Sequence, residues 1–183
     1  MKTIFVLPII TILLFSIWSC KKSSSKPAGT SYFISAMVGG SAKTFNVSAL
    51  AADTTLSGGS TGIVIIGLSD STGSPAAFDL TISNSPGLKP ITTGTYTDTS
   101  TSYTLNSDYY SNYYATMSFN AGTGFASIAS GAGISITNHL KVVITSLSST
   151  EIKGTFSGDY YFDGDPSASA TTITNGSFYL KFR

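Results

Sequence analysis

Phe78-Asp79-Leu80-Thr81-Ile82 alternates apolar and polar side chains. Neighbouring side chains of an extended strand point to opposite faces, so this stretch predicts a strand with one face on a core. The same alternation recurs at 134–137, 140–144, 151–157 and 177–182, and in a stripe of Tyr113, Ala115, Met117 and Phe119. A sustained 3.6-residue period does not occur beyond the first 20 residues. These stretches therefore predict β-strands whose inward faces carry apolar side chains.

Clusters of Gly, Asn, Asp, Ser and Pro separate these stretches at about the spacing of turns between short strands. Such clusters occur at 39–40, 58–59, 70–75, 84–87 and 163–166. Residues 62–68 form a continuous apolar run, which is typical of a strand covered on both faces. About nine or ten short strands with turn clusters between them predict an all-β fold, either an antiparallel β-sandwich or a flattened β-barrel.

One short pattern appears three times, as Gly94-Thr95-Tyr96, Gly154-Thr155-Phe156 and Gly176-Ser177-Phe178. Glycine lets the chain turn or pass close to a neighbour, and the aromatic ring two positions later can face the core. We interpret each copy as the start of a strand. Phe156 and Phe178 are accordingly expected to point inward.

The first 20 residues have the features of a cleaved secretory signal. Lys2 precedes an apolar run from Ile4 to Ile17, which is too short to span a bilayer as a helix. Ile17-Trp18-Ser19-Cys20 resembles the lipobox of bacterial lipoproteins, although Trp18 stands where a small residue is usual. The resemblance implies that Cys20, the only cysteine, carries a diacylglycerol that holds the protein on a membrane. We expect a signal peptide at 1–19, an acylated cysteine with a flexible tether at 20–30, and a single all-β domain at 31–183.

A second resemblance covers most of residues 31–183. Gly94-Thr95-Tyr96 and the segments 134–137, 152–157 and 173–178, in this order, resemble the small secreted lipoproteins of Bacteroidota-type bacteria that are known only as domains of unknown function. The resemblance implies a lipoprotein with an all-β domain and brings no catalytic residue. It places the protein in the cell envelope, on the outer membrane. Acidic residues often follow the cysteine in lipoproteins exported to the cell surface, and none follows Cys20, which favours the periplasmic face.

Charged residues make up only 10% of the chain. The net charge beyond residue 30 is −3, and Lys and Arg form no stripe there. A phosphate backbone is bound chiefly by clustered positive charge, so we do not expect nucleic-acid binding.

The sequence shows no catalytic pattern. His139 is the only histidine, and Cys20 is expected to be acylated, so zinc sites built from His and Cys are excluded by number. A Gly-x-Ser-x-Gly elbow is absent. Asn138-His139 stands between two alternating stretches and predicts a two-residue hairpin with an exposed histidine. We therefore expect a protein that is not an enzyme.

Asp159, Asp163 and Asp165 lie close together around Gly164. Oxygen ligands at alternating positions suit Ca²⁺, but the loop lacks the later bidentate glutamate of an EF-hand. Asp-Gly between strands is also a common hairpin signal. A plain turn is the favoured interpretation, and calcium is the alternative; no other cofactor is expected.

The segment 103–114 contains five tyrosines together with Asn106, Asp108 and Asn112. Tyrosine joins an apolar face to a polar tip, which suits stacking on sugars. Tyr109, Tyr110 and Tyr114 are the candidate ligand-binding residues. Tyr110 and Tyr114 alternate opposite to Tyr113 along a strand, and Tyr109 is included because we expect it to lie in a loop. The favoured interpretation is nevertheless that these rings only pack on neighbouring strands, with Tyr113 in the core and Tyr114 on the surface; ligand binding is the alternative.

The favoured function is a membrane-anchored, non-enzymatic domain for binding or envelope structure, with a glycan or an envelope protein as the partner. One alternative is a hydrolase acting on glycans, and another is a lipocalin-like carrier of an apolar ligand. A solid core would support the first, a cleft with two facing carboxylates the second, and a central apolar cavity the third.

Overall fold

The computed structural model describes residues 31–55, 60–71, 74–84, 88–100, 102–115, 120–127, 136–165 and 167–183. These residues form eleven strands and no helix, which confirms the predicted all-β class. The strands are β1 (Phe33–Val38), β2 (Ser41–Thr44), β3 (Val47–Thr55), β4 (Thr61–Leu68), β5 (Ala77–Asn84), β6 (Gly94–Thr97), β7 (Tyr103–Ala115), β8 (Asn120–Ser127), β9 (Lys141–Leu147), β10 (Glu151–Phe162) and β11 (Thr171–Lys181). The described part of the chain holds no helix of the length and apolarity needed to cross a membrane.

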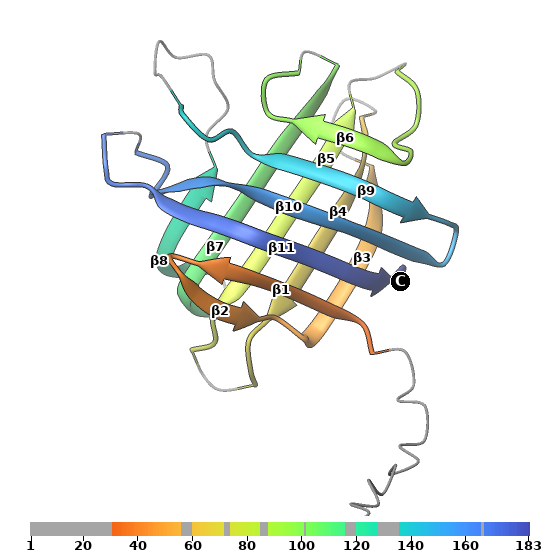
Figure 1. The fold of residues 1–183 in the computed structure, drawn as a ribbon. Helices are drawn as coiled ribbons and strands as arrows, with labels where there is room; N and C mark the ends of the chain where they lie inside the picture. The colour runs from red at the N-terminus through yellow and green to blue at the C-terminus, as the bar shows by residue number, and fades with distance from the viewer. Residues whose placement is uncertain are drawn as a thin grey trace, which may run out of the picture. The chain divides into compact units, whose positions relative to one another are not determined.

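The strands lie in two layers, one in front of the other (Figure 1). The rear layer has the order β8-β7-β5-β4-β3, and the front layer has the order β6-β9-β10-β11-β1-β2. Strands hydrogen-bonded as neighbours within each layer are antiparallel. The front strands run across the rear strands, one of the two ways in which twisted sheets pack. The architecture is therefore an antiparallel β-sandwich, as predicted.

The two layers are joined at both corners. Ile152–Ser157 of β10 pair with β9 in the front layer, whereas Tyr160–Phe162 of the same strand pair with β8, so the sheet continues into the rear layer. At the other corner Ala51 of β3 forms a parallel bridge with Phe182, and the backbone N–H of Arg183 donates to the carbonyl of Ala51 at 3.1 Å. The long strand β10 thus belongs to both layers.

Alternation along β5 is as predicted. Phe78, Leu80 and Ile82 are buried in the core, while Asp79 and Thr81 lie on the outer face of the rear layer. The apolar run 62–68 becomes β4, and it was expected to be covered on both faces. Its inward residues are buried, but its outward residues are only half-buried, so this face of the layer keeps apolar surface in reach of solvent.

Four phenylalanines form a continuous stack between the layers. The ring centroids of Phe45 and Phe78 are 5.7 Å apart, those of Phe78 and Phe156 are 4.5 Å apart, and those of Phe156 and Phe178 are 6.4 Å apart. All four side chains are at most 3% exposed. The expected inward orientation of Phe156 and Phe178 is thereby confirmed.

The two glycine motifs of the front layer form a reciprocal pair. Gly154 of β10 stands opposite Phe178 of β11, and Phe156 stands opposite Gly176. A Cβ at Gly154 would clash with the Phe178 ring, and one at Gly176 would clash with the Phe156 backbone. Each glycine is therefore required because an aromatic ring on the next strand lies over it. The interpretation as strand starts holds for Gly94, which begins β6, and is wrong for the other two, which lie within their strands.

The expected stripe beginning at Tyr113 is also corrected. Met117 and Phe119 lie outside the described residues, and Tyr113 is on the outer face because a β-bulge between Tyr110 and Tyr113 shifts the register of β7 on β8. Of the first strand of the predicted hairpin at Asn138-His139, residues 134–135 lie outside the described part of the chain. The second strand of this hairpin is β9, which pairs with β6 and β10.

Candidate functional site

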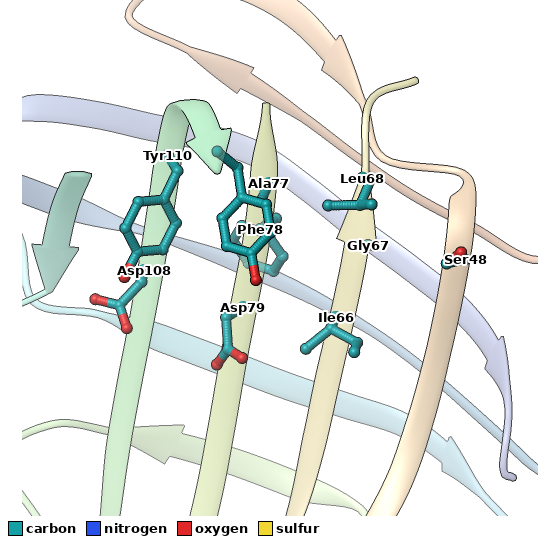
Figure 2. A pocket seen from close by; sticks show the side chains of 10 residues that line it. Ser48, Ile66, Gly67, Leu68, Ala77, Phe78, Asp79, Asp108 and Tyr110 are labelled. Atoms are coloured by element: carbon teal, nitrogen blue, oxygen red, sulfur yellow. The ribbon is translucent and has the colours of Figure 1, made fainter. Parts of the chain in front are cut away.

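A pocket of about 370 Å³ opens on the outer face of the rear layer, across β3, β4, β5 and β7 (Figure 2). Its polar side chains are those of Asp79, Asp108, Tyr110, Tyr113 and Ser48. A volume of this size falls in the lower range of small-molecule sites. The pocket is therefore the first place to look for a ligand.

The two carboxylates meet because of strand register. Asp79 points outward by the alternation of β5, and the antiparallel pairing of β5 with β7 sets Asp108 directly opposite. Side chains so paired have Cβ atoms about 4.5–5.5 Å apart. Figure 2 shows both carboxylates side by side on the same face of the layer. Like charges directly opposite one another destabilise a sheet, so this pairing is unusual for a purely structural surface.

The two tyrosines meet because of the bulge in β7. Without it, residues three apart on a strand would face opposite sides. With it, the Tyr110 and Tyr113 rings lie in an edge-to-face arrangement with centroids 5.8 Å apart. The backbone N–H of Tyr113 also donates to the carbonyl of Pro75 at 2.7 Å, which ties this end of β7 to the segment before β5.

The remaining wall is apolar. Ile66 and Leu68 of β4 and Ala77 of β5 line the pocket beside the rings. Ile66 and Leu68 are outward residues of the apolar run, and their side chains are half-buried. The pocket thus combines carbon surface on one side with carboxylates on the other.

Burial and charge both act on the acidic groups. Burial raises the pKa of Asp79 to about 6, and the neighbouring charge of Asp108 adds to that rise. The hydroxyl of Thr81 donates to Asp79 Oδ1 at 3.4 Å, which opposes the rise in pKa only in part. Burial likewise raises the pKa of Asp108. The pKa of Tyr110 is raised by burial first and then by the charges of Asp108, Asp79 and Asp163.

Buried hydrogen bonds hold the backbone under the carboxylates. The Ser107 hydroxyl donates to the carbonyl of Asp79 at 2.6 Å, and the hydroxyl of Tyr160 donates to Ser107 Oγ at 2.6 Å. Ser107 is 1% exposed and Tyr160 is fully buried. This network links β5, β7 and β10, so the position of Asp79 is set from within the core.

Of the three candidate tyrosines, one lines the pocket, one is in the core, and one has a side chain that is not described. Tyr110 lines the pocket, whereas Tyr109 is 5% exposed and its ring packs edge-on against Phe45, with centroids 6.1 Å apart. Tyr109 was included as a loop residue, and that placement is wrong because it lies within β7 with its side chain in the core. The side chain of Tyr114 lies outside what the structure describes.

The acidic loop after β10 is a turn. Asp163 and Gly164 both have positive φ angles, 48° and 69°, and the N–H of Asp165 donates to the carbonyl of Phe162 at 2.8 Å. This is the Asp-Gly hairpin turn that the sequence favoured. Asp159 Oδ1 accepts bonds from Asn138 and Thr172, and Asp165 Oδ1 accepts from Ser167. Among the described residues, no three His, Cys, Asp or Glu side chains gather as a metal site would require.

His139 is not the freely exposed turn residue that was expected. Its Nδ1 lies 2.8 Å from Oδ1 of Asp98, and its side chain is 31% exposed. Asp98 is buried, and its Oδ2 accepts the backbone N–H of Leu140 at 2.9 Å. The pair therefore joins the segment before β9 to the turn after β6. Cys20, the expected acylation site, lies outside the described residues.

Sequence reasoning missed Asp79, Asp108 and Tyr113 as site residues. Asp79 could be recognised as outward-facing from the alternation alone. Its meeting with Asp108 depends on the pairing of β5 with β7, and Tyr113 reaches the pocket only through the bulge; neither has a local sequence signal. Comparisons with protein-family models, curated proteins and solved structures give no match to this chain, so its function has to be inferred from the site itself.

Proposed function

We propose that this chain is an envelope lipoprotein, held on the outer membrane through acylated Cys20, whose β-domain binds a small ligand without transforming it. The ligand lies in the pocket of Asp79, Asp108, Tyr110 and Tyr113. The observation that carries the proposal is the pocket itself, in which two half-buried carboxylates and two rings converge on the outside of the rear layer.

The packing of the interior supports binding on the outside. The four stacked phenylalanines occupy the space between the layers where a lipocalin-like carrier would need its cavity. An apolar ligand in that space would have to displace rings that are almost fully buried. The outer pocket needs no such rearrangement.

One observation favours the glycan hydrolase as a second candidate, namely the paired carboxylates. Glycosidases use two carboxyl groups that flank the scissile bond. Asp79 and Asp108 instead lie side by side on one face of one sheet, so both would approach a ligand from the same side (Figure 2). This arrangement suits charge recognition better than acid–base attack from two sides.

The proposal is tested with a thermal-shift panel on the full chain, covering neutral sugars, amines, carboxylates and divalent cations. We expect at least one class to raise the Tm of the wild type and to leave Tyr110→Ala unshifted. Tyr179→Ala is the matched control, because it removes a half-buried tyrosine from the other layer and should keep the response. A panel with no response, or a response that survives in Tyr110→Ala, contradicts the proposal. Turnover of aryl glycosides that is lost in both Asp79→Asn and Asp108→Asn would establish the hydrolase instead.

A further inference from the structure

We propose that the ligand of this pocket is a small organic cation, an ammonium group with short apolar substituents, held between the Asp79–Asp108 pair and the rings of Tyr110 and Tyr113. This inference rests on the proposed function and names its ligand class. It is drawn from the charge, the aromatic surface and the apolar wall of the same pocket, taken together.

The charge of the pocket lacks an internal counterpart. Of the ten described residues that line it, none is Lys, Arg or His, and two are carboxylates. Asp163, in the turn after β10, adds a third negative charge that acts on Tyr110. An anionic ligand would be repelled here, and a neutral one would leave two adjacent, half-buried charges uncompensated. A cation removes their mutual repulsion, which strengthens as water is excluded.

The rings favour a cation that is weakly hydrated. Aromatic faces attract ammonium groups through their quadrupole, and cages of rings and carboxylates are a recurrent way to hold quaternary ammonium groups. The edge-to-face arrangement of Tyr110 and Tyr113 makes two walls set at an interplanar angle of 64°. Such a corner can contact two sides of one rounded cationic head.

The apolar wall distinguishes an organic cation from a metal ion. Ca²⁺ takes six to eight oxygen ligands. Beside the two carboxylates and the hydroxyls of Ser48, Tyr110 and Tyr113, this pocket has a carbon-only wall of apolar side chains from Ile66, Leu68 and Ala77. Methyl or methylene groups of an alkylammonium ion would bury that surface, and a bare metal ion would not.

Calorimetry with an isosteric pair of probes tests the inference. Choline and 3,3-dimethylbutan-1-ol have nearly the same shape, and only choline carries a charge. The full chain is titrated in cacodylate buffer, because Tris is itself an ammonium ion and phosphate precipitates Ca²⁺. The detergent is a polyoxyethylene, which carries neither sugar nor ammonium. We expect choline to bind at least tenfold more tightly than the alcohol, and Ca²⁺ to give no heat of binding. Nα-acetyl-lysinamide is the third probe, so that the comparison with choline separates a free metabolite from a protein side chain as the source of the ammonium group.

Paired variants connect the binding to the pocket. Asp108→Asn should weaken choline at least tenfold while leaving the weak binding of the alcohol unchanged. Asp53→Asn is the control, because it makes the same chemical change on β3 outside this pocket and should bind as the wild type does. Equal binding of choline and the alcohol, or tighter binding of a neutral sugar that is lost in Tyr110→Ala, overturns the organic cation and leaves the proposed binding function standing. Absence of binding by every probe in both experiments overturns both.

Discussion

Asp79 occupies a position that is unfavourable for a carboxylate, because it is largely buried and Asp108 lies directly opposite. The charged and polar groups around it are Asp108 and Tyr110 on β7 and Thr81 on its own strand. Of these, only the hydroxyl of Thr81 lowers the pKa of Asp79. A residue so placed is easier to explain by what it binds than by what it stabilises.

The stability of the domain should therefore fall as the pH rises through the range in which Asp79 ionises. Its folded pKa of about 6 lies above the ordinary value of 3.8, so the folded state holds this proton more tightly than the unfolded chain does. Unfolding then releases protons between these values, and stability falls as pH rises. A rise of that size corresponds to at most about 3 kcal/mol above pH 6.

Asp79→Asn should raise the Tm at pH 7.5, and the gain should disappear near pH 4, where Asp79 in the wild type is protonated. Thermal denaturation of both proteins across this range measures the effect. If Asp79 were instead a hydrogen-bonded carboxylate that stabilises the fold, its replacement would lower the Tm at neutral pH, and this outcome would contradict the prediction. The same variant should also lose choline binding, so stability and binding move in opposite directions.

The orientation of single side chains shows how much of the structure could be predicted from the sequence. The outward orientation of Asp79 and the inward orientation of Phe156 and Phe178 follow from period-two alternation, and the structure agrees. Tyr109 could not be assigned in the same way, because a loop was expected at a position where β7 continues. The turn at Asp163-Gly164 was recognisable, since few other dipeptides accept two positive φ angles.

Among the elements, β10 and β11 supply two of the four stacked phenylalanines of the core. Phe156→Ala and Phe178→Ala should each lower the free energy of unfolding by about 3–5 kcal/mol. Both rings lie in the stack between the layers, and each also covers a glycine of the neighbouring strand. Chemical denaturation measures the loss, with exposed Thr155→Ala on the same strand as the control, expected to cost under about 1 kcal/mol. Losses below about 1 kcal/mol at both phenylalanines would mean that the rings do not support the core.

The bulge in β7 explains why the site could be anticipated only in part. Period-two alternation assigns Tyr110 and Tyr113 to opposite faces, and the extra residue of the bulge returns both to one face. The register of β5 on β7 is equally hidden, because β6 lies between them in the chain and pairs elsewhere. Strand identity is a local property of this sequence, whereas the site depends on pairings between segments distant in the chain.

For the molecule as a whole, the anchor remains to be tested. Cys20→Ala should abolish acylation and release the protein from the membrane fraction, because the chain has no other cysteine. Fractionation with a high-salt wash, followed by detection of incorporated labelled fatty acid, measures both effects. If the variant stays with the membranes after the wash, the lipoprotein assignment is wrong.

The pairing of β1 with β11 has a consequence for biosynthesis. β1 is bordered by β2 and β11, and Ser35 meets Ser177 across 142 residues of chain. β1 is therefore made well before its partner β11, and the front layer cannot be completed until β11 has been made. Until β11 emerges, β1 keeps an unpaired edge, the kind of edge that invites pairing with other chains. Contacts so distant in sequence also slow folding. The nascent polypeptide is consequently open to pairing with its copies until β11 has been made and the front layer can close.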